Sequence, residues 1–261
     1  MSPSPPAALQ TFGLCKDFRG FRAVDGVDLT VAEGSVHALV GPNGAGKTTL
    51  FNLLTGFLRP TAGRIEVAGS DITGLPPDRV ARRGVARSFQ ITSLFDQLSA
   101  REHVELALAS GGGLGWKFWR SDRLLGRHRA GALDLLDRVG LAGVEAEPAG
   151  TLPYGRKRAL ELALALALDP RVLLLDEPTA GMGAEDVERT VELVRQVRGG
   201  RTVVLVEHNM SVVADLADRV TVLRAGTVLV EGPYAEVRQD PRVVEAYLGT
   251  ATTGGTADAA R

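Results

Sequence analysis

Residues 41–48 read Gly-Pro-Asn-Gly-Ala-Gly-Lys-Thr, which is the spacing G-x-x-x-x-G-K-[ST] of a phosphate-binding loop (P-loop). The apolar run "ALV" precedes the loop and "TLFNLL" follows it, as expected for a strand and a helix. Glycines let successive backbone N–H groups turn toward phosphate oxygens, and the following helix presents its positive end to the same anion. We therefore expect ATP here, with Lys47 at the terminal phosphates and the Thr48 hydroxyl on Mg²⁺. The residues expected to contact the nucleotide in this loop are Gly41, Pro42, Asn43, Gly44, Ala45, Gly46, Lys47, Thr48 and Thr49.

Two carboxylates end a second apolar run, "RVLLLDEP". A carboxylate at the carboxyl edge of a parallel sheet lies where an α/β nucleotide site gathers its ligands. We expect Asp176 to bind Mg²⁺, through water, and Glu177 to act as the base or the orienting group for the attacking water. The alternative is that the two acidic residues only end a strand.

A histidine follows a third apolar run, "RTVVLVEHNM". Its position just past a strand end favours a contact between His208 and the γ-phosphate, although a lone histidine is more often structural. Gln90, after "GVARSF", is a weaker candidate that depends on the other residues. The expected catalytic residues are Lys47, Gln90, Glu177 and His208.

The elements that must position these residues alternate along the chain. Short β-branched runs with glycine turns fill residues 9–90, residues 91–152 read as helical, and strands and helices alternate again afterwards. Ser99 and Glu102 form a capping-box pattern at one helix start. Buried strands separated by helices predict an α/β fold with a mostly parallel sheet, a β-rich N-terminal part and an inserted helical subdomain.

Composition limits the remaining function classes. The chain has 261 residues, 44% of them hydrophobic, and a net charge of −1, so no basic field favours nucleic acid as a partner. Its single cysteine, Cys15, cannot form an internal disulfide. The longest apolar run, "ALELALALAL", is shorter than a membrane span and contains Glu161. We expect a soluble chain whose membrane contact comes through a partner.

Five motifs occur in a fixed order: the P-loop, Gln90, the segment "LPYGR", "LLLDEP" and "VEH". Together they resemble the ATP-binding cassette (ABC) ATPases of membrane transporters. The resemblance implies a P-loop NTPase (RecA-like) core over residues 9–249, with the helical subdomain at about residues 91–158. We expect residues 1–8 and 250–261 to be disordered.

In that family the signature segment of one subunit closes over the ATP on the P-loop of another. The sequence contains one P-loop, so the resemblance implies a second ATPase subunit. It also implies that Phe18 stacks on adenine, with Phe12 and Phe21 as alternatives. Gln90 is implied to bind the metal ion together with Thr48 and Asp176, and to link the site to the membrane partner. The signature residues implied are Leu152, Pro153, Tyr154, Gly155 and Arg156.

Two residues depart from the family pattern. Pro153 replaces the usual serine and removes an N–H and a hydroxyl, and Gly183 lies near the place of the usual aspartate after Glu177. Fewer donors to the γ-phosphate and altered communication between two ATP sites are the expected consequences.

Three stretches are similar to one ATPase subunit of branched-chain amino-acid importers. They are the Tyr-Gly pair of the signature, "VEHNMSVVADLADRV" and the closing "EGPYAEVRQDPRVVEAYLG". The resemblance implies permease subunits and, indirectly, a solute-binding protein as partners, and a place on the cytoplasmic face of the bacterial inner membrane. The solute could instead be a related small molecule. An exporter or lipid-transport ATPase, a non-transport ABC ATPase and a regulatory nucleotide-binding protein remain alternatives. Trp116, Phe118 and Trp119 form either a packed loop or an aromatic patch that contacts a permease or membrane surface.

Overall fold

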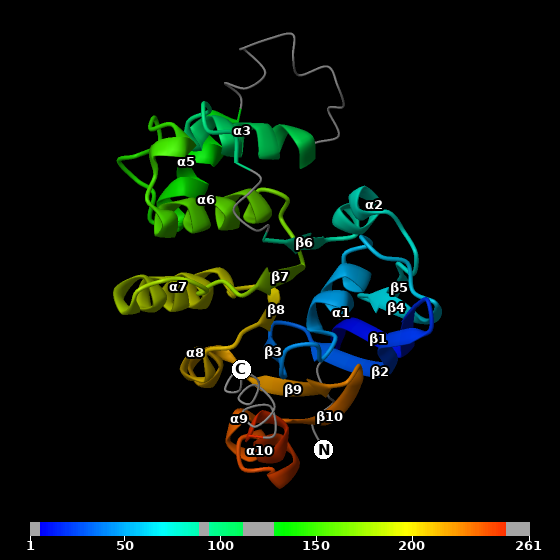
Figure 1. Ribbon diagram of the computed structural model, residues 1–261. Coiled ribbons are helices and arrows are strands. Elements are labelled where there is room, and N and C mark those ends of the chain that lie inside the picture. The colour runs from blue at the N-terminus through cyan, green and yellow to red at the C-terminus, as the bar shows by residue number, and fades with distance from the viewer. Residues whose placement is uncertain (1–5, 89–93, 112–127, 249–261) are drawn as a thin grey trace, which may run out of the picture.

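The computed structural model describes residues 6–88, 94–111 and 128–248. Gln90 and the aromatic residues Trp116, Phe118 and Trp119 lie outside the described residues, and the predictions about them stay predictions. Within the described ranges, the central sheet has six strands in the order β10-β9-β3-β8-β7-β6 (Figure 1). They are β3 (Val36–Val40), β6 (Val85–Arg87), β7 (Val172–Asp176), β8 (Thr202–Val206), β9 (Arg219–Arg224) and β10 (Thr227–Gly232).

The pairs from β9 across to β6 are all parallel, and β10 pairs antiparallel with β9. The mostly parallel sheet that the sequence predicts is therefore confirmed. In a parallel sheet all carboxyl ends meet at one edge, so the segments after β3, β7 and β8 come together there.

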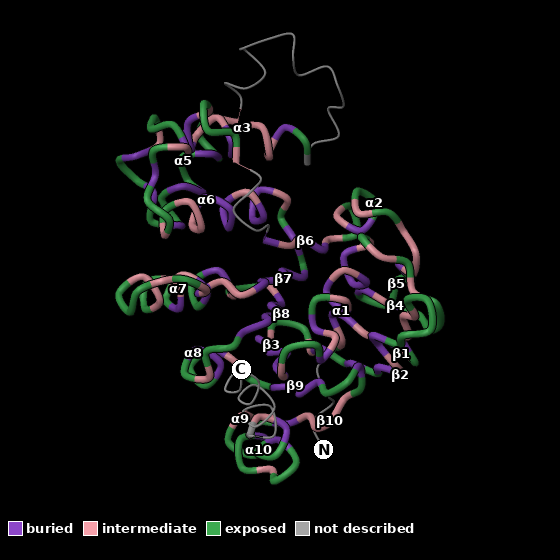
Figure 2. Tube along the Cα trace, viewed as in Figure 1, coloured by how far each residue is buried: buried purple, intermediate pink, exposed green. Residues whose placement is uncertain are grey.

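Successive residues of the central strands point to opposite faces of the sheet and enter two separate cores. Leu173 and Leu175 of β7 pack in one core, and Leu174 packs in the other. Because helices or a second sheet cover both faces, every residue of β3, β7 and β8 is buried (Figure 2). This explains the uninterrupted apolar runs in the sequence.

The β-rich N-terminal part forms an antiparallel sheet, with the order β2-β1-β4-β5 among the described residues. Its strands are β1 (Ala7–Phe18), β2 (Phe21–Ala32), β4 (Ala62–Val67) and β5 (Ser70–Asp71). Helix α1 (Lys47–Leu54) packs in the core that this sheet shares with the central sheet. The expectation that residues 1–8 are disordered is wrong for residues 7 and 8, because Ala7 pairs with Ala32 and Ala8 is buried.

Helices α3 (Ala100–Gly111), α5 (Arg129–Arg138) and α6 (Tyr154–Leu166) form a separate lobe at the top of Figure 1, and a 3₁₀ turn, Ala149–Thr151, precedes α6. The capping box before α3 is confirmed: the Ser99 N–H donates to Glu102 Oε2 (2.7 Å), and the Glu102 N–H donates to Ser99 Oγ (3.3 Å). Helix α6 extends to Leu166, past the expected boundary at about residue 158, and Leu160 and Leu166 pack in the same core as Val104 of α3 and Leu136 of α5.

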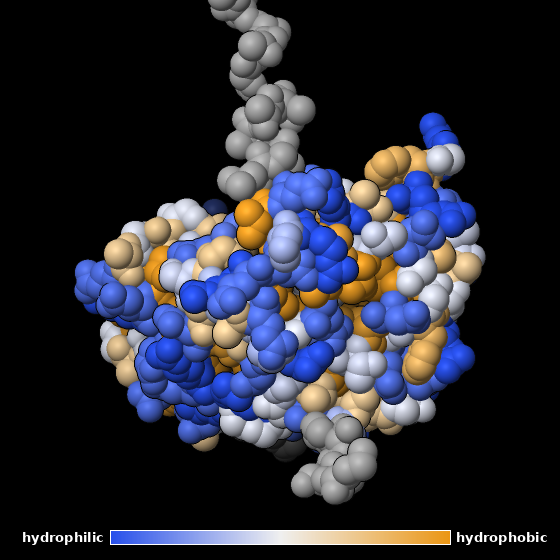
Figure 3. Space-filling view, turned by 90° about the horizontal axis from the view of Figure 1, so that it is seen from below, coloured by the Kyte–Doolittle hydropathy of each residue, from blue (hydrophilic) through white to orange (hydrophobic). Residues whose placement is uncertain are grey.

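The other helices within the described residues lie around the central sheet and its last strands. They are α2 (Pro77–Arg82), α7 (Ala184–Val197), α8 (Met210–Leu216), α9 (Tyr234–Val237) and α10 (Pro241–Leu248). The face seen from below in Figure 3, on the side of α9 and α10, is mostly hydrophilic, with apolar residues showing between the polar ones. Within residues 6–88, 94–111 and 128–248, every helix is too short or too polar to span a bilayer.

Candidate functional site: a P-loop at the carboxyl edge of the sheet

The P-loop connects the end of β3 to the start of α1, as predicted. Helix α1 begins at Lys47 after Gly46, whose φ of 99° lies in the left-handed region, and the Leu50 N–H donates to the Gly46 carbonyl (2.9 Å). Asn43 and Gly44 are exposed at the loop, as is Thr48 in the first turn of the helix. The loop therefore presents its backbone and the positive end of α1 to solvent at the carboxyl edge of the sheet.

Two glycines of the loop are fixed by close contacts with neighbouring strands. A Cβ atom on Gly46 would lie 2.4 Å from the Ala23 carbonyl oxygen of β2, and one on Gly41 would lie 2.2 Å from the Leu223 carbonyl oxygen of β9. Both distances are far below van der Waals contact, and the neighbours are backbone atoms. Only glycine fits at these two positions.

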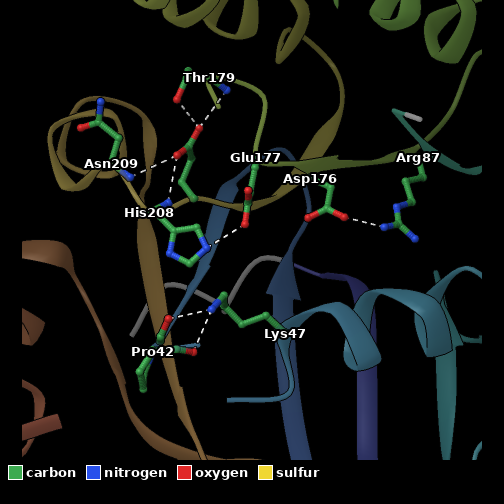
Figure 4. Close-up of polar contacts among 10 residues, drawn as sticks. Pro42, Lys47, Arg87, Asp176, Glu177, Thr179, His208 and Asn209 are labelled. Atoms are coloured by element: carbon green, nitrogen blue, oxygen red, sulfur yellow. Dashed lines mark hydrogen bonds and ion pairs between the residues drawn. The ribbon is translucent and has the colours of Figure 1, made fainter. Parts of the chain in front are cut away.

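The Lys47 ammonium lies against the backbone of its own loop. Its Nζ donates to the Gly41 carbonyl (2.7 Å) and to the Pro42 carbonyl (3.0 Å) (Figure 4). Burial lowers the pKa of Lys47, while the carboxylates of Glu177 and Asp176 act in the opposite direction. The lysine therefore lies in the electrostatic field of both acidic residues.

Asp176 is the last residue of β7, and its carboxylate is paired with an arginine that the sequence analysis did not single out. Arg87 Nη2 donates to Asp176 Oδ2 (2.5 Å) (Figure 4), and Arg87 Nη1 donates to Asn52 Oδ1 (2.7 Å). Both members of the ion pair are largely buried. Arg87 thereby connects the end of β6, the end of β7 and helix α1.

Glu177 and His208 meet at the same edge, as expected from their positions after β7 and β8. His208 Nε2 lies 2.7 Å from Glu177 Oε1, and both side chains are partly exposed (Figure 4). A carboxylate held by an imidazole and open to solvent can accept a proton from a water molecule. The backbone of Glu177 adopts φ 47°, a left-handed conformation that is uncommon for a residue with a side chain.

Glu207, between β8 and His208, is a further residue that the sequence analysis missed. Its carboxylate is buried and accepts hydrogen bonds from Thr179, which follows Glu177, and from the backbone at His208 and Asn209. One signal in the sequence could have identified it, because an acidic residue at the end of an apolar strand needs buried donors.

The signature candidates lie at the start of α6. Leu152 is buried, Gly155 faces Asp186 of α7, and Pro153, Tyr154 and Arg156 are exposed. Pro153 occupies the position before the first helical residue, and its carbonyl accepts from the Lys157 N–H (3.0 Å). The replacement of serine by proline is therefore compatible with the helix start. Tyr154 Oη donates to the Ala180 carbonyl (2.9 Å) and so connects α6 to the segment after Glu177.

The aromatic candidates for adenine differ in their surroundings. Phe18 and Phe21 pair with each other at the end of the β1–β2 hairpin and are both exposed. The Arg64 guanidinium covers the Phe12 ring, 3.9 Å from its centroid. Because Ala23 lies against Gly46, the hairpin brings Phe18 and Phe21 toward the P-loop. Phe18 stays a prediction, with Phe21 as the alternative on the same hairpin.

The oxygen donors at the edge of the sheet suit Mg²⁺. Among the residues that the structure describes, no group of three or more His, Cys, Asp or Glu side chains could hold a metal ion. Mg²⁺ in nucleotide sites usually takes one or two protein oxygens and completes its shell with phosphates and water. Asp176 uses Oδ2 for Arg87, which leaves Oδ1 for such a role, and Thr48, which carries a hydroxyl, is exposed. These donors fit the ion.

A P-loop between β3 and α1, with carboxylates at the end of β7 and a histidine after β8 at one sheet edge, defines a P-loop ATPase. Residues 24–180 match the family model described as ABC transporter, and residues 227–252 match the one described as Branched-chain amino acid ATP-binding cassette transporter. The chain belongs to the ABC transporter family and is one of its ATPase cassettes.

Individual relatives agree with this assignment. The high-affinity branched-chain amino acid transport ATP-binding protein BraF of Pseudomonas aeruginosa is 39% identical over 253 residues, covering 93% of this chain and 98% of BraF. The ADP conformation of MJ1267, an ATP-binding cassette of an ABC transporter, superposes with a TM-score of 0.82 at 28% identity, over 93% of this chain and 99% of that one. A dimeric post-hydrolysis cassette, MJ0796 bound to ADP and Pi, has a TM-score of 0.73 at 25% identity, over 87% and 98%.

Proposed function

We propose that this cassette hydrolyses ATP at the carboxyl edge of its central sheet and energises the uptake of branched-chain amino acids or related small solutes across a bacterial inner membrane. The contact that carries the hydrolysis proposal is the 2.7 Å pair of His208 Nε2 and Glu177 Oε1. The name of BraF and the family match of residues 227–252 support the choice of solute class and of import.

The residues at the edge divide the work of hydrolysis. Backbone N–H groups of the P-loop, the positive end of α1 and the Lys47 ammonium bind the phosphates and stabilise the negative charge that develops on them. Glu177 orients the attacking water and accepts its proton, and His208 holds the Glu177 carboxylate in place. Gln90 is proposed to join them at the γ-phosphate. Catalysis of this kind depends on positioning and charge stabilisation, without a covalent intermediate on the protein.

Mg²⁺ is part of the proposal. The Thr48 hydroxyl and Asp176 would hold it, together with Gln90, and the ion would neutralise charge on the phosphates. The remaining chemistry rests on the side chains and backbone groups of the chain.

A complete site is proposed to need a second ATPase subunit. The single P-loop of the sequence, the exposed Pro153, Tyr154 and Arg156 at the start of α6, and the dimeric MJ0796 cassette support this arrangement. The partner is either a copy of this chain or a related cassette bound to the same permeases, and the permeases provide attachment to the cytoplasmic face of the membrane.

Replacement of Glu177 by Gln tests the catalytic assignment. The variant keeps the size of the side chain and loses the base, so ATP binding should persist while turnover falls by about 10²–10⁴-fold. Phosphate release and the binding of a fluorescent ATP analogue measure the two properties on the same preparation. Hydrolysis near the wild-type rate would remove Glu177 from this role.

Purification of the tagged chain from its native membranes tests the transport assignment. Two permeases, a second cassette and a solute-binding protein in the purified complex are the expected result. Uptake of labelled leucine by vesicles containing that complex, dependent on internal ATP, would then identify the solute class. Recovery of a lipid-export permease would contradict the proposed direction and solute while leaving the ATPase assignment intact.

A further inference from the structure

We infer that Glu207 is a positioning residue for the ATP hydrolysis proposed above. Its buried carboxylate joins the segment that carries Glu177 to the segment that carries His208, and it thereby fixes the distance between the two side chains. The inference rests on the proposed function and assigns a task to Glu207, the residue of the "VEH" motif that directly precedes His208.

Four hydrogen bonds converge on this carboxylate. Oε1 accepts from the Thr179 N–H (3.0 Å) and from Thr179 Oγ1 (2.5 Å), and Oε2 accepts from the His208 N–H (2.9 Å) and the Asn209 N–H (3.2 Å) (Figure 4). Glu207 is only 3% exposed. Removing a carboxylate from water is costly unless donors replace the lost hydration, and these four donors supply that replacement.

The two oxygens face different parts of the site. Oε1 holds a residue two positions after Glu177, and Oε2 holds the peptide N–H of His208 itself. The carboxyl group is rigid and planar, so the two segments cannot move apart without breaking hydrogen bonds on one side. The 2.7 Å contact between His208 Nε2 and Glu177 Oε1 spans the same two segments. Glu207 thus acts on the catalytic pair through the backbone, since its hydrogen bonds go to Thr179 and to the peptide N–H groups of His208 and Asn209.

The backbone at Glu177 shows why such a restraint is needed. Its φ of 47° is a left-handed conformation, which costs a residue with a side chain free energy that the surroundings must offset. The Glu177 N–H donates to the Val206 carbonyl (2.9 Å), and the Ala180 N–H donates to the Glu177 carbonyl (3.1 Å). Thr179 lies within this turn, and Glu207 holds it by both its N–H and its hydroxyl. Without Glu207 the turn loses its main side-chain restraint.

A carboxylate is the side chain that this geometry requires. A glutamine at position 207 keeps one acceptor oxygen and replaces the other by an NH₂ group, which is a donor. Whichever way the amide turns, either the Thr179 pair or the His208 and Asn209 pair faces a donor and loses its acceptor. The substitution therefore tests the bridge while preserving side-chain volume.

The test compares Glu207→Gln with Glu231→Gln in the full-length chain. Glu231, whose side chain is 24% exposed, accepts from Arg219 Nη2 (3.0 Å) and Thr221 Oγ1 (3.0 Å) on β9, away from the site, so it is a control for the loss of a hydrogen-bonded carboxylate. Glu207→Gln should lower kcat by roughly tenfold to a hundredfold, the effect of displacing a catalytic group by about 1 Å. The dissociation constant of a fluorescent ATP analogue should stay within about twofold, because the P-loop is not changed. Glu231→Gln should leave both kcat and the dissociation constant of the ATP analogue unchanged.

Two further comparisons separate positioning from a general loss of structure. Thr179→Val removes only the hydroxyl bond and should lower kcat by a smaller factor, and Thr179→Ser, which keeps the hydroxyl, should retain more activity than Thr179→Val. In a His208→Ala background, Glu207→Gln should have less effect on single-turnover hydrolysis than in the wild type, because the residue that it positions is gone. If Glu207→Gln is insoluble, the comparison of Thr179→Val with Thr179→Ser tests the same restraint.

The outcomes also separate this inference from the proposed function. A wild-type chain without ATPase activity, alone or in its purified complex, would refute the proposed function and this inference with it. An active wild type with Glu207→Gln turning over at the same rate would refute the positioning role alone. Equal losses of kcat and of nucleotide affinity, or full additivity with His208→Ala, would also refute it, because a structural defect predicts both.

Discussion

The ion pair of Arg87 and Asp176 provides the sharpest quantitative test of the site. Arg87→Met keeps an apolar stem and removes every donor, leaving the Asp176 carboxylate without its arginine. The side chains of the pair are 14% and 8% exposed. Removing one partner of a buried pair costs about 3–5 kcal/mol of the free energy of unfolding, because an uncompensated charge stays buried. The nearby Lys47 ammonium compensates part of that charge, so we expect a value near the lower limit.

Arg201 provides a matched control in the same chain. Its side chain is also 14% exposed, but its partner Asp169 is 91% exposed and returns to water when the arginine is removed. Arg201→Met should therefore cost about 0–1 kcal/mol, the usual range for such pairs. The two substitutions remove the same guanidinium and differ mainly in the burial of the carboxylate that remains.

Urea unfolding without nucleotide measures the difference. With an m-value of about 3 kcal/mol per M, a loss of 3 kcal/mol lowers the midpoint by about 1 M. Adding Asp176→Asn to Arg87→Met should recover part of the loss, because the buried charge is gone. Equal midpoints for Arg87→Met and Arg201→Met, or no recovery in the double variant, would refute the argument from the buried charge.

Two other features yield predictions that unfolding experiments can check. Burial lowers the pKa of His37 to about 4 from 6.5, so the unfolded chain takes up a proton that the folded chain excludes as the pH falls through this window. The free energy of unfolding should therefore decrease by about 3 kcal/mol between pH 6.5 and pH 4 because of this group. His37→Gln, which keeps a polar atom for Thr221, should show a smaller decrease over the same pH range. Equal decreases in the wild type and the variant would contradict the assignment to His37. In the P-loop, Gly46→Ala should destabilise by more than about 3 kcal/mol, through a clash with Ala23 and left-handed strain together. At Gly44 φ is +78° and no atom lies within 4 Å of an added Cβ, so Gly44→Ala should destabilise by only about 1–2 kcal/mol. Equal unfolding midpoints for Gly46→Ala and Gly44→Ala would exclude the clash.

The parts of the fold that the sequence predicted are those with local signals. The P-loop has a fixed spacing, the capping box joins residues three apart, and apolar runs that end in Asp176 and His208 indicate strands that reach one edge. The boundaries were less well predicted. Ala7 and Ala8 belong to β1 because of their pairing and burial, which the Pro-rich start of the sequence conceals.

Arg87 and Glu207 were missed because their partners are distant in sequence. Asp176 lies 89 positions after Arg87, and Thr179 lies 28 positions before Glu207. No periodicity or motif relates such pairs, and only the strand order places them together. An acidic or basic residue at the end of a buried strand is the usable signal in each case, since a charge there must find a partner.

The close packing of Gly41 and Gly46 also limits what the P-loop pattern can reveal about a relative of this chain. Both residues lie where a Cβ would collide with a neighbouring strand, so the architecture requires them even if no nucleotide binds. A lineage that lost ATPase activity would still be selected to keep both glycines in order to fold. Lys47, Glu177 and His208 have no such second constraint from backbone packing. In a decaying copy, those three side chains should be the first to change, and they are better indicators of retained activity than the glycines.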